Sequence, residues 1–334
     1  MSRKKIAYIF PIYNEAENID VLYNAITAIV EQELTDYDVE FIFVNDGSKD
    51  ESLDRLLGIR EFDDRVSVLS FSRNYGHQVA VTAGLDAADA DAVIIMDSDM
   101  QDPPRVSVEL VRKWETGADV VYAQRRSRKD TLFKRATAHS FYWLLARLAS
   151  IEIPRNTGDF RLLDRRVVEE LRKYREHNRF LRGLVSYVGF RQEAVQFDRD
   201  ARYAGKTGYP FGKMVRFAMD GILGFSVVPL QLISRLGYLL SFGALLGTLY
   251  VVGVRLFDPA AAVPGWAFVT VSVFLIGGIQ LVMLGVLGSY VGRTYVEVQQ
   301  RPLYTIEVAA TGRRLEMPAS IPVPVPVAVT QRRS

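Results

Sequence analysis

The sequence has no cysteine and only three histidines among its 334 residues. The absence of cysteine excludes disulfide bonds, thiolate metal sites and cysteine nucleophiles. The net charge of +2 is small and gives no indication of nucleic-acid binding. The N-terminus is basic at residues 3–5, but it continues into a short strand-like segment rather than a signal-peptide core. We therefore expect no cleaved targeting sequence.

Charged residues are missing from two long stretches near the C-terminus, residues 236–254 and 259–292. As a helix, the first stretch is roughly 28 Å long, close to the hydrocarbon thickness of a bilayer at about 30 Å. The second is long enough to cross at a tilt. We predict two transmembrane helices, at about residues 236–256 and 264–290. A buried hairpin in a soluble protein is the alternative.

The charges around this hydrophobic pair predict its orientation. The connection at residues 255–259 holds a single basic residue, whereas several basic residues flank the pair on both outer sides. Basic residues concentrate on the cytoplasmic side of membrane proteins, so we expect both termini in the cytoplasm and a multi-pass protein of the inner or plasma membrane. The flanking residues are Lys206, Lys213, Arg216, Arg235, Arg293, Arg301, Arg313 and Arg314.

The composition predicts four regions. Residues 1–210 form a soluble domain, residues 211–234 an amphipathic helical segment, residues 235–292 the two transmembrane helices, and residues 293–334 a tail. Apolar residues recur at helical spacing in residues 211–225, which fits a helix in the lipid interface or one packed on the soluble domain. The Pro-Val alternation at residues 321–326 predicts a disordered end to the tail.

The soluble domain alternates apolar runs of strand length with amphipathic helical patterns. Strands are predicted at residues 6–10, 39–44, 66–70 and 93–96, and helices at residues 16–30 and 52–60. Continuously apolar strands between such helices are typical of a mostly parallel sheet with helices on both faces. The predicted fold class is therefore α/β and Rossmann-like.

Polar side chains follow three of these strands directly. Asp46, Arg73, and the pair Asp97 and Asp99 each come after an apolar run. Ligands of open α/β sheets bind beyond the carboxyl ends of the strands, so we expect all four side chains at one crevice. A carboxylate pair there is suited to a metal-bound diphosphate, because Mg²⁺ and Mn²⁺ prefer oxygen ligands.

Four segments, in this order, resemble the signature blocks of the family 2 glycosyltransferases: residues 11–15 (PIYNE), 44–48 (VNDGS), 97–104 (DSDMQDPP) and 156–161 (NTGDFR). The chain is most similar to the family's polyprenyl-phosphate glycosyltransferases, which include dolichol-phosphate mannose synthase and the bactoprenol glucosyltransferases. The resemblance implies a GT-A fold. It also implies transfer of a sugar from a nucleoside diphosphate to a polyprenyl phosphate, with inversion at the anomeric carbon.

The resemblance also implies which residues bind the donor. Around the base and ribose it places Pro11, Tyr13, Glu15, Val44, Asp46, Asp97 and Ser98. At the diphosphate and its Mg²⁺ or Mn²⁺ ion it places Asp99 as the direct ligand, with Asp97 nearer the ribose or a metal-bound water and Gln101 assisting. For Asp102 we expect a helix N-cap just before Pro103.

The acceptor phosphate needs cations more than it needs a base. A phosphate monoester has a second pKa near 6 and is mostly ionised at pH 7. Two unit charges about 4 Å apart repel by roughly 4 kcal/mol at an effective dielectric of 20, so basic side chains should offset the approach of one phosphate to another. Our candidates are Arg125, Arg135, His139, Arg202 and Lys206.

These candidates have different support. Arg202 and Lys206 lie in residues 202–209 (RYAGKTGY), which resemble the family's phosphate-contacting loop, although Gly208 stands where relatives commonly have lysine or asparagine. Arg125 and Arg135 delimit a basic run that could equally be a solvated loop or a membrane-surface patch. His139 could equally be a packed helix residue.

Asp159 is the predicted catalytic residue. In the family's pattern the aspartate after residues 156–158 faces the reacting centre, as a base or as an orienting group. A helix cap for a run starting near Arg161 is the alternative.

Glucose transfer from UDP-glucose to undecaprenyl phosphate is the leading hypothesis for the whole chain. The Gln-x-x-Arg-Trp block of processive polysaccharide synthases is absent, which favours one sugar per lipid. GDP-mannose or another nucleotide sugar is a second possibility, and a non-catalytic nucleotide-sugar sensor in the membrane is a third. Gly277, Gly278, Gly285 and Gly288 have the spacing of close helix contacts, so we expect a homo-oligomer such as a tetramer.

Overall fold

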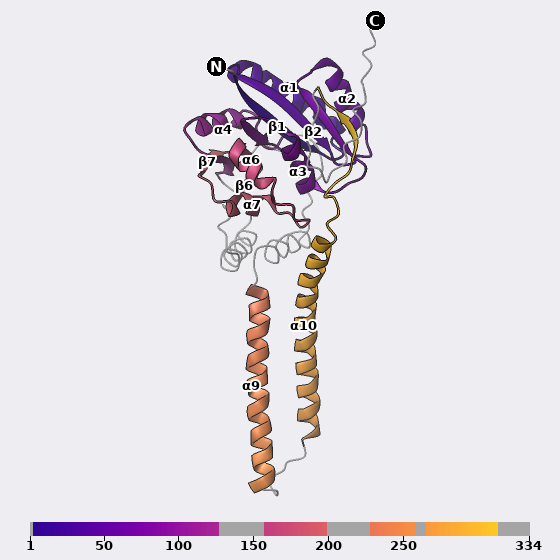
Figure 1. The fold of residues 1–334 in the computed structure, drawn as a ribbon, viewed down its shortest axis with the longest axis vertical. Helices are drawn as coiled ribbons and strands as arrows, with labels where there is room; N and C mark the ends of the chain where they lie inside the picture. The colour runs from indigo at the N-terminus through magenta and orange to yellow at the C-terminus, as the bar shows by residue number, and fades with distance from the viewer. Residues whose placement is uncertain (1–2, 127–156, 199–227, 258–264, 313–334) are drawn as a thin grey trace.

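The computed structural model describes residues 3–126, 157–198, 228–257 and 265–312. Within them an α/β domain lies above a pair of long helices, α9 and α10, that extend from one side of it (Figure 1).

The first half of the domain has the predicted alternation of strands and helices. Its elements are β1 (Lys4–Ile12), α1 (Ala16–Glu33), β2 (Tyr37–Asn45), α2 (Ser52–Phe62), β3 (Val66–Phe71), α3 (His77–Ala87) and β4 (Ala92–Ile95). The four strands pair in parallel in the order β4-β1-β2-β3. The α1 helix forms where predicted because Ile19, Leu22 and Ile26 recur on one face and are fully buried.

The second half widens the sheet through an antiparallel strand. It contains α4 (Val106–Glu115), β5 (Val120–Arg125), β6 (Thr157–Asp164), α6 (Arg165–Leu171), α7 (Leu181–Tyr187) and β7 (Gln192–Phe197). The β6 strand lies between β4 and β5 and is antiparallel to both, while β7 pairs in parallel with β5. Six of the eight strands in the described sheet run in one direction, so the predicted mostly parallel sheet is confirmed.

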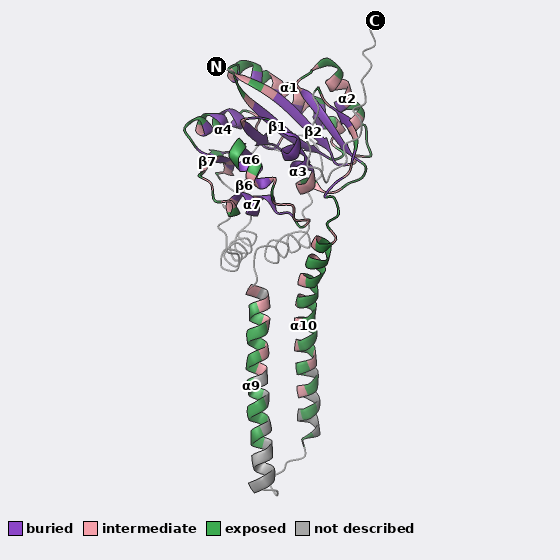
Figure 2. Ribbon diagram, in the orientation of Figure 1, coloured by how far each residue is buried: buried purple, intermediate pink, exposed green. Residues whose placement is uncertain are grey.

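Helices cover both faces of the sheet, as the apolar strands predict. On one face α1, α2 and α4 bury Leu22, Leu56 and Leu110 against the strands. On the other face α3, α6 and α7 bury side chains such as Val81 and Leu184. Figure 2 shows the inner strands, such as β1 and β2, as mostly buried, with exposed residues on the outer sides of the helices. Two apolar layers therefore fix the sheet and the loops that leave it.

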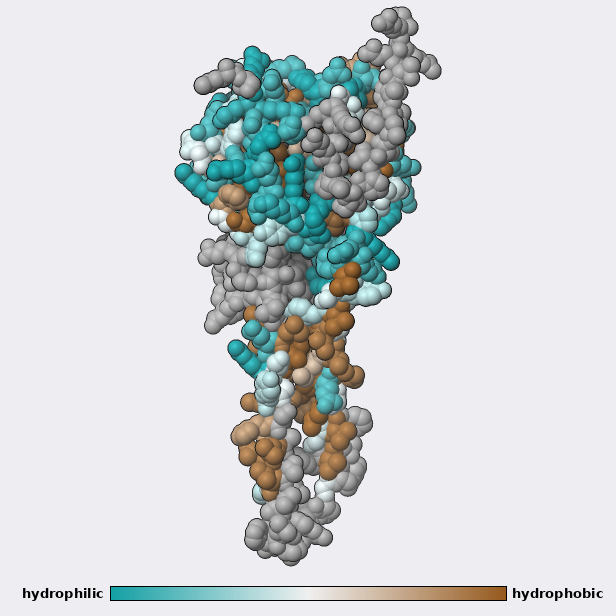
Figure 3. Space-filling model, viewed as in Figure 1, coloured by the Kyte–Doolittle hydropathy of each residue, from teal (hydrophilic) through white to brown (hydrophobic). Residues whose placement is uncertain are grey.

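The two apolar helices are α9 (Val228–Phe257) and α10 (Trp266–Val298), and they lie side by side. Windows long and apolar enough to cross a membrane are Leu230–Gly247 in α9 and Leu275–Val298 in α10. Large apolar side chains such as Phe242 and Leu281 are exposed on them, and Figure 3 shows hydrophobic surface on this pair beneath a largely hydrophilic domain. This distribution fits association with a membrane.

The boundaries of these helices differ from the predicted ones. The α9 helix already begins at Val228, inside the segment predicted as interfacial, and α10 continues to Val298. Most of the predicted interfacial segment, residues 211–227, lies outside the described residues. A membrane helix can continue past its charge-free run, because long charged side chains near its ends can reach water. The charge-free runs therefore underestimate the length of both helices.

The region after residue 293 is not simply a tail, and this prediction was wrong for its first part. After α10 the chain forms β8 (Ile306–Ala310), which pairs antiparallel with β3 and completes the sheet order β7-β5-β6-β4-β1-β2-β3-β8. Leu303 and Tyr304 are buried beside it. The chain thus returns from the second apolar helix into the domain.

Candidate active site

Asp159 lies in β6 and accepts hydrogen bonds from side chains of two helices. Arg182 of α7 donates from Nε to Oδ1 at 2.7 Å. His77 and Gln78, at the N-terminus of α3, approach Oδ2 at 3.1 and 3.2 Å through Nε2 of each side chain. The carboxylate is only 5% exposed. Asp159 is therefore a buried anion with cationic partners on both oxygens.

This environment makes Asp159 a weak base. Burial alone would raise the pKa of Asp159, but the charges and hydrogen bonds of Arg182 and His77 outweigh it and hold that pKa well below the ordinary value. Burial would lower the pKa of His77, yet its hydrogen bond to Asp159 and the charges of Asp97 and Asp159 raise it to about 9. His77 is thus an imidazolium at neutral pH.

Asp97 lies beside this group, just beyond the end of β4. Its Oδ1 is 3.6 Å from Nε2 of His77, and within the described part of the chain this buried oxygen accepts no hydrogen bond. Burial raises the pKa of Asp97, the His77 charge opposes this, and Asp159, Asp102 and Asp99 add to it. A carboxylate in such surroundings is stabilised by an added cation.

Asp99 and Gln101 form the turn that follows. Oδ1 of Asp99 accepts from the backbone N–H of Gln101 at 3.2 Å, and Met100 between them has a φ of 56°. No group of three or more His, Asp or Glu side chains arranged to hold a metal occurs among the described residues. A divalent ion here would need further oxygens from water or substrate, which fits the chemistry of Mg²⁺ bound with phosphates.

The expected helix cap at Asp102 was wrong. The α4 helix begins only at Val106, and its N-cap position is Arg105. Asp102 is instead buried, with Oδ1 3.6 Å from Nη2 of Arg125. Arg125 also lies close to Gly158, where an added Cβ would be 3.4 Å from Nη2. Arg125, a predicted phosphate ligand, therefore packs under the backbone that carries Asp159.

The alternative interpretation of Asp159 as a helix cap was also wrong. Residues 157–164 form the β6 strand, and the following helix α6 is capped by Asp164, whose side chain accepts from the backbone of Arg166. β6 thus projects Asp159 from the sheet into the site.

Asp46 organises a neighbouring turn. Its carboxylate is buried and accepts from the backbone N–H groups of Tyr75 at 2.6 Å and Gly76 at 2.9 Å, and from Nδ2 of Asn74 at 2.9 Å. Gly47 follows with a φ of 64°, and a Cβ there would be 2.4 Å from the carbonyl carbon of Arg73. Asp46 therefore fixes the turn that leads into α3 and so places His77.

The other residues predicted around the nucleotide lie on the same edge of the sheet and differ in exposure and hydrogen bonding. Tyr13 is 44% exposed, and Ser98 donates from its hydroxyl to the Pro11 carbonyl at 3.3 Å. The backbone N–H of Glu15 donates to the Ser52 hydroxyl at 3.1 Å. The side chain of Val44 is fully buried in the core, so it could meet a ligand only through its backbone.

Four predicted phosphate ligands cannot be placed. Arg135, His139, Arg202 and Lys206 lie outside the described residues.

The sequence interpretation missed His77, Gln78, Arg182 and Arg161. Arg161 is buried two residues after Asp159; its Nη2 donates to the Gly158 carbonyl at 2.9 Å, and burial lowers its pKa to about 10. A signal existed for the first two, because the polar turn at residues 72–76 ends in a glycine directly before them. Arg182 has no comparable local signal.

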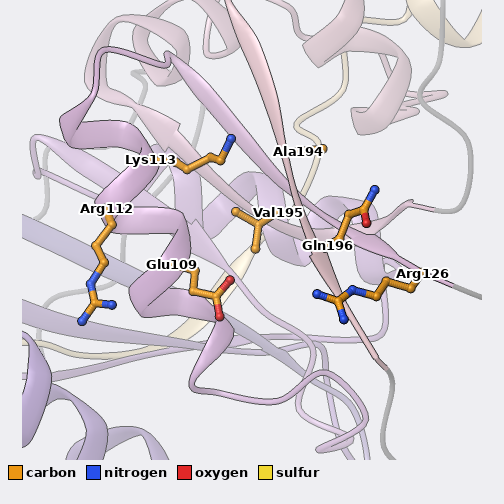
Figure 4. Close-up of a pocket in the computed structure, with 7 residues that line it drawn as sticks. All are labelled: Glu109, Arg112, Lys113, Arg126, Ala194, Val195 and Gln196. Atoms are coloured by element: carbon orange, nitrogen blue, oxygen red, sulfur yellow. The ribbon is translucent and has the colours of Figure 1, made fainter.

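A surface cavity of about 370 Å³ lies elsewhere, between α4 and the edge strand β7 (Figure 4). Glu109, Arg112, Lys113, Arg126 and residues 194–196 line it, and none of the predicted site residues does so. Its three cations are already paired: Lys113 with Glu193 at 2.9 Å, Arg112 with Glu33 at 3.4 Å and Arg126 with Asp198 at 3.8 Å. The cavity is separate from the site around Asp159.

Comparison with known proteins places the chain in a family. The profile of "Glycosyl transferase family 2" matches residues 8–172. The "Uncharacterized glycosyltransferase YkcC" of Bacillus subtilis is 45% identical over 309 residues, which cover 92% of this chain and 95% of that protein. The "SfII prophage-derived bactoprenol glucosyl transferase" of Shigella flexneri is 40% identical over 310 residues, 92% and 99% of the two chains.

Among solved structures, the glucosyl-3-phosphoglycerate synthase of Mycobacterium tuberculosis with Mn²⁺, UDP and phosphoglyceric acid is similar at 20% identity and a TM-score of 0.44, covering 66% of this chain and 76% of that one. That likeness is too distant to support any statement about this site. The relatives at 40–45% identity match over nearly the full length of both chains, and this chain belongs to glycosyl transferase family 2.

Proposed function

We propose that this glycosyltransferase moves one sugar, most simply glucose from UDP-glucose, onto a polyprenyl phosphate such as undecaprenyl phosphate, with inversion, at the cytoplasmic face of a membrane. The main support for the proposal is that one chain combines an acidic cluster suited to a metal-bound diphosphate with a pair of apolar helices suited to a membrane. A cluster of Asp97, Asp99 and Asp159 lies at the carboxyl edge of a sheet, and two apolar helices leave the same domain. Relatives named bactoprenol glucosyl transferase support the lipid acceptor and the glucose.

We infer that Asp99 and Asp97, with Gln101 nearby, hold a Mg²⁺ or Mn²⁺ ion together with the donor diphosphate. Oδ1 of Asp97 accepts no hydrogen bond from the described residues, and this oxygen and the raised pKa of the carboxyl group fit a cation at this place. When bound, such an ion would neutralise charge on the departing diphosphate. Tyr13, Glu15 and Asp46 would lie toward the nucleoside, beside the turn that Asp46 holds.

We propose that Asp159 orients groups in the reaction rather than abstracting a proton. The acceptor phosphate is already ionised at neutral pH, and Arg182 and His77 keep the pKa of Asp159 low. The approach of two phosphates would be offset by basic side chains, for which Arg125, Arg135, His139, Arg202 and Lys206 remain the candidates. Arg125 would have to exchange its contact with Asp102 for such a role.

The test is transfer by the purified protein. The assay combines protein in detergent, Mn²⁺, undecaprenyl phosphate and, one at a time, radiolabelled UDP-glucose, GDP-mannose and other nucleotide sugars. The proposal expects a labelled lipid from UDP-glucose. Label from a different donor would keep the lipid acceptor and correct the sugar. No labelled lipid from any donor would favour the sensor hypothesis.

The proposed orientation can be tested in cells because the chain has no cysteine of its own. Gly265, at the start of α10, and Gly312, after β8, are both exposed. If both termini are cytoplasmic, Gly265→Cys will react with a membrane-impermeant maleimide in intact spheroplasts, and Gly312→Cys will react only after permeabilisation. The reverse pattern would overturn the orientation.

We also propose a homo-oligomer. A Cβ added at Gly277, Gly278, Gly285 or Gly288 would meet no atom of the described residues within 4 Å, so these small residues leave room for another helix. A monomeric mass in detergent would contradict the proposal.

A further inference from the structure

Residues 172–182 form hydrogen bonds with both ends of α3. At the C-terminal end of that helix Arg172 donates from Nε to the Leu85 carbonyl at 2.9 Å, and Arg175 donates from Nη1 to both carboxylate oxygens of Asp86 at 2.8 and 2.9 Å. Cations at this end also interact favourably with the helix dipole. The connecting segment is therefore fastened where α3 ends.

The same segment is fastened again where α3 begins. The backbone N–H of Leu181 donates to Oε1 of Gln78 at 2.9 Å, and Nε2 of Gln78 donates to Asp159 at 3.2 Å. The next residue, Arg182, donates to the other oxygen of Asp159 at 2.7 Å. A displacement of this segment would thus move two of the three hydrogen-bond partners that Asp159 has among the described residues.

The end of α10 holds the middle of this segment. Glu297, in the last turn of α10, accepts from the backbone N–H of His177 at 2.8 Å and lies 3.2 Å from its Nδ1. Nε2 of His177 is 2.8 Å from the Arg301 carbonyl. Seven residues after Glu297, the buried hydroxyl of Tyr304 donates to Asp86 at 2.8 Å. The chain that leaves the apolar helix thus contacts both His177 and the Asp86–Arg175 pair.

We propose that Glu297 is a positioning residue that fixes the height of the active site above the bilayer. Through His177 it holds residues 172–182, and with them the part of the domain that contains Asp159, at a fixed distance from the end of α10. The inference depends on the proposed function, because only an acceptor whose phosphate is held at the depth of the lipid head groups requires a fixed height. α3 and α7 lie on the side of the domain from which the helices extend, as this role requires (Figure 1).

The first test compares two acceptors with the Glu297→Ala variant. In proteoliposomes with undecaprenyl phosphate, we expect kcat to fall by about tenfold, the loss that corresponds to about 1.4 kcal/mol, with an unchanged KM for the nucleotide sugar. With a water-soluble two-isoprenoid phosphate in detergent, kcat should change by less than about twofold. Glu297→Gln keeps an oxygen for the His177 N–H and should recover part of the loss. Glu307→Ala, an exposed glutamate in β8, is the matched control.

Two results would overturn the inference. Unchanged transfer to undecaprenyl phosphate would show that Glu297 positions nothing, and equal losses on both acceptors would reduce it to a general structural role. If the wild-type protein transfers sugar to neither acceptor, the proposed function itself has failed.

A second test needs no substrate and separates these failures. In lipid nanodiscs, hydrogen exchange at the amides of His177 and Leu181 should be faster in Glu297→Ala than in wild type and in Glu307→Ala. Faster exchange at His177 without any change at Leu181 would show that the effect of Glu297 does not reach the Leu181–Gln78 hydrogen bond, and it would overturn the inference.

Discussion

The buried pair Arg182–Asp159 should contribute far more to stability than a surface pair of the same geometry. Nε of Arg182 lies 2.7 Å from Oδ1 of Asp159, and the two side chains are 27% and 5% exposed. Removing one partner of a buried ion pair costs about 3–5 kcal/mol, because the other charge stays buried. Since His77 still contacts Asp159 in Arg182→Gln, we expect the lower end, about 3 kcal/mol.

The measurement is thermal unfolding of purified, metal-free protein in detergent. For a domain of 150–250 residues, about 3 kcal/mol corresponds to a decrease in Tm of roughly 6–12 °C. The control is Arg55→Gln, because Arg55 has the same 2.7 Å distance to Asp20 but the side chains are 40% and 52% exposed. An exposed pair of this kind is worth about 0–1 kcal/mol.

A double-mutant cycle completes the test. Asp159→Asn removes the carboxylate that Arg182 and His77 share, and the combined Asp159→Asn, Arg182→Gln variant should lose less stability than the sum of the single variants. We expect a coupling of about 1–3 kcal/mol. Equal Tm shifts for Arg182→Gln and Arg55→Gln, or a coupling below about 0.5 kcal/mol, would refute the reasoning from burial.

Three further predictions concern the same region. Because the pKa of His77 is raised from 6.5 to about 9, its stabilising effect is complete below about pH 6.5 and is lost as the pH rises through 9; the Tm of metal-free protein should fall over this range, and His77→Gln should flatten the fall. EDTA should abolish sugar transfer, Mn²⁺ should restore it, and Asp99→Asn should raise the Mn²⁺ concentration needed, whereas an unchanged requirement would remove Asp99 from the metal site. Gly84→Ala should cost about 1–3 kcal/mol in a denaturation assay, because its Cβ would lie 2.4 Å from Cγ2 of Ile9; unchanged stability would show that α3 can move off β1.

The parallel half of the fold was predictable because its signals are local. Each strand there is a largely apolar run that the sheet buries, and the first is followed by α1, whose apolar stripe of Ile19, Leu22 and Ile26 packs on the sheet. The carboxyl ends of parallel strands must share one edge, so the positions of Asp46 and Asp97 followed from chain order alone.

The antiparallel half was not predictable in the same way. β6 reads Thr-Gly-Asp-Phe-Arg-Leu-Leu-Asp, in which a turn followed by a helix is as plausible as a strand. Only its pairing with β4 and β5 decides between them, and those partners lie more than 30 residues earlier in the chain. The contacts of Asp159 with His77 and Arg182 depend on that pairing, so no local pattern could have shown them.

The return of the chain into the sheet changes what the apolar helices do for the domain. A tail that left α10 without returning to the sheet would add no restraint on the orientation of the domain relative to α10. Instead only residues 299–305 separate α10 from β8, a reach of at most about 25 Å even if fully extended. Tyr304 lies within that stretch, and its buried hydroxyl donates a hydrogen bond to Asp86. β8 also covers the outer edge of β3, which would otherwise expose unpaired backbone groups. One short segment thus completes the sheet and restrains the site relative to α10, and a substrate embedded in the bilayer gives that restraint a purpose.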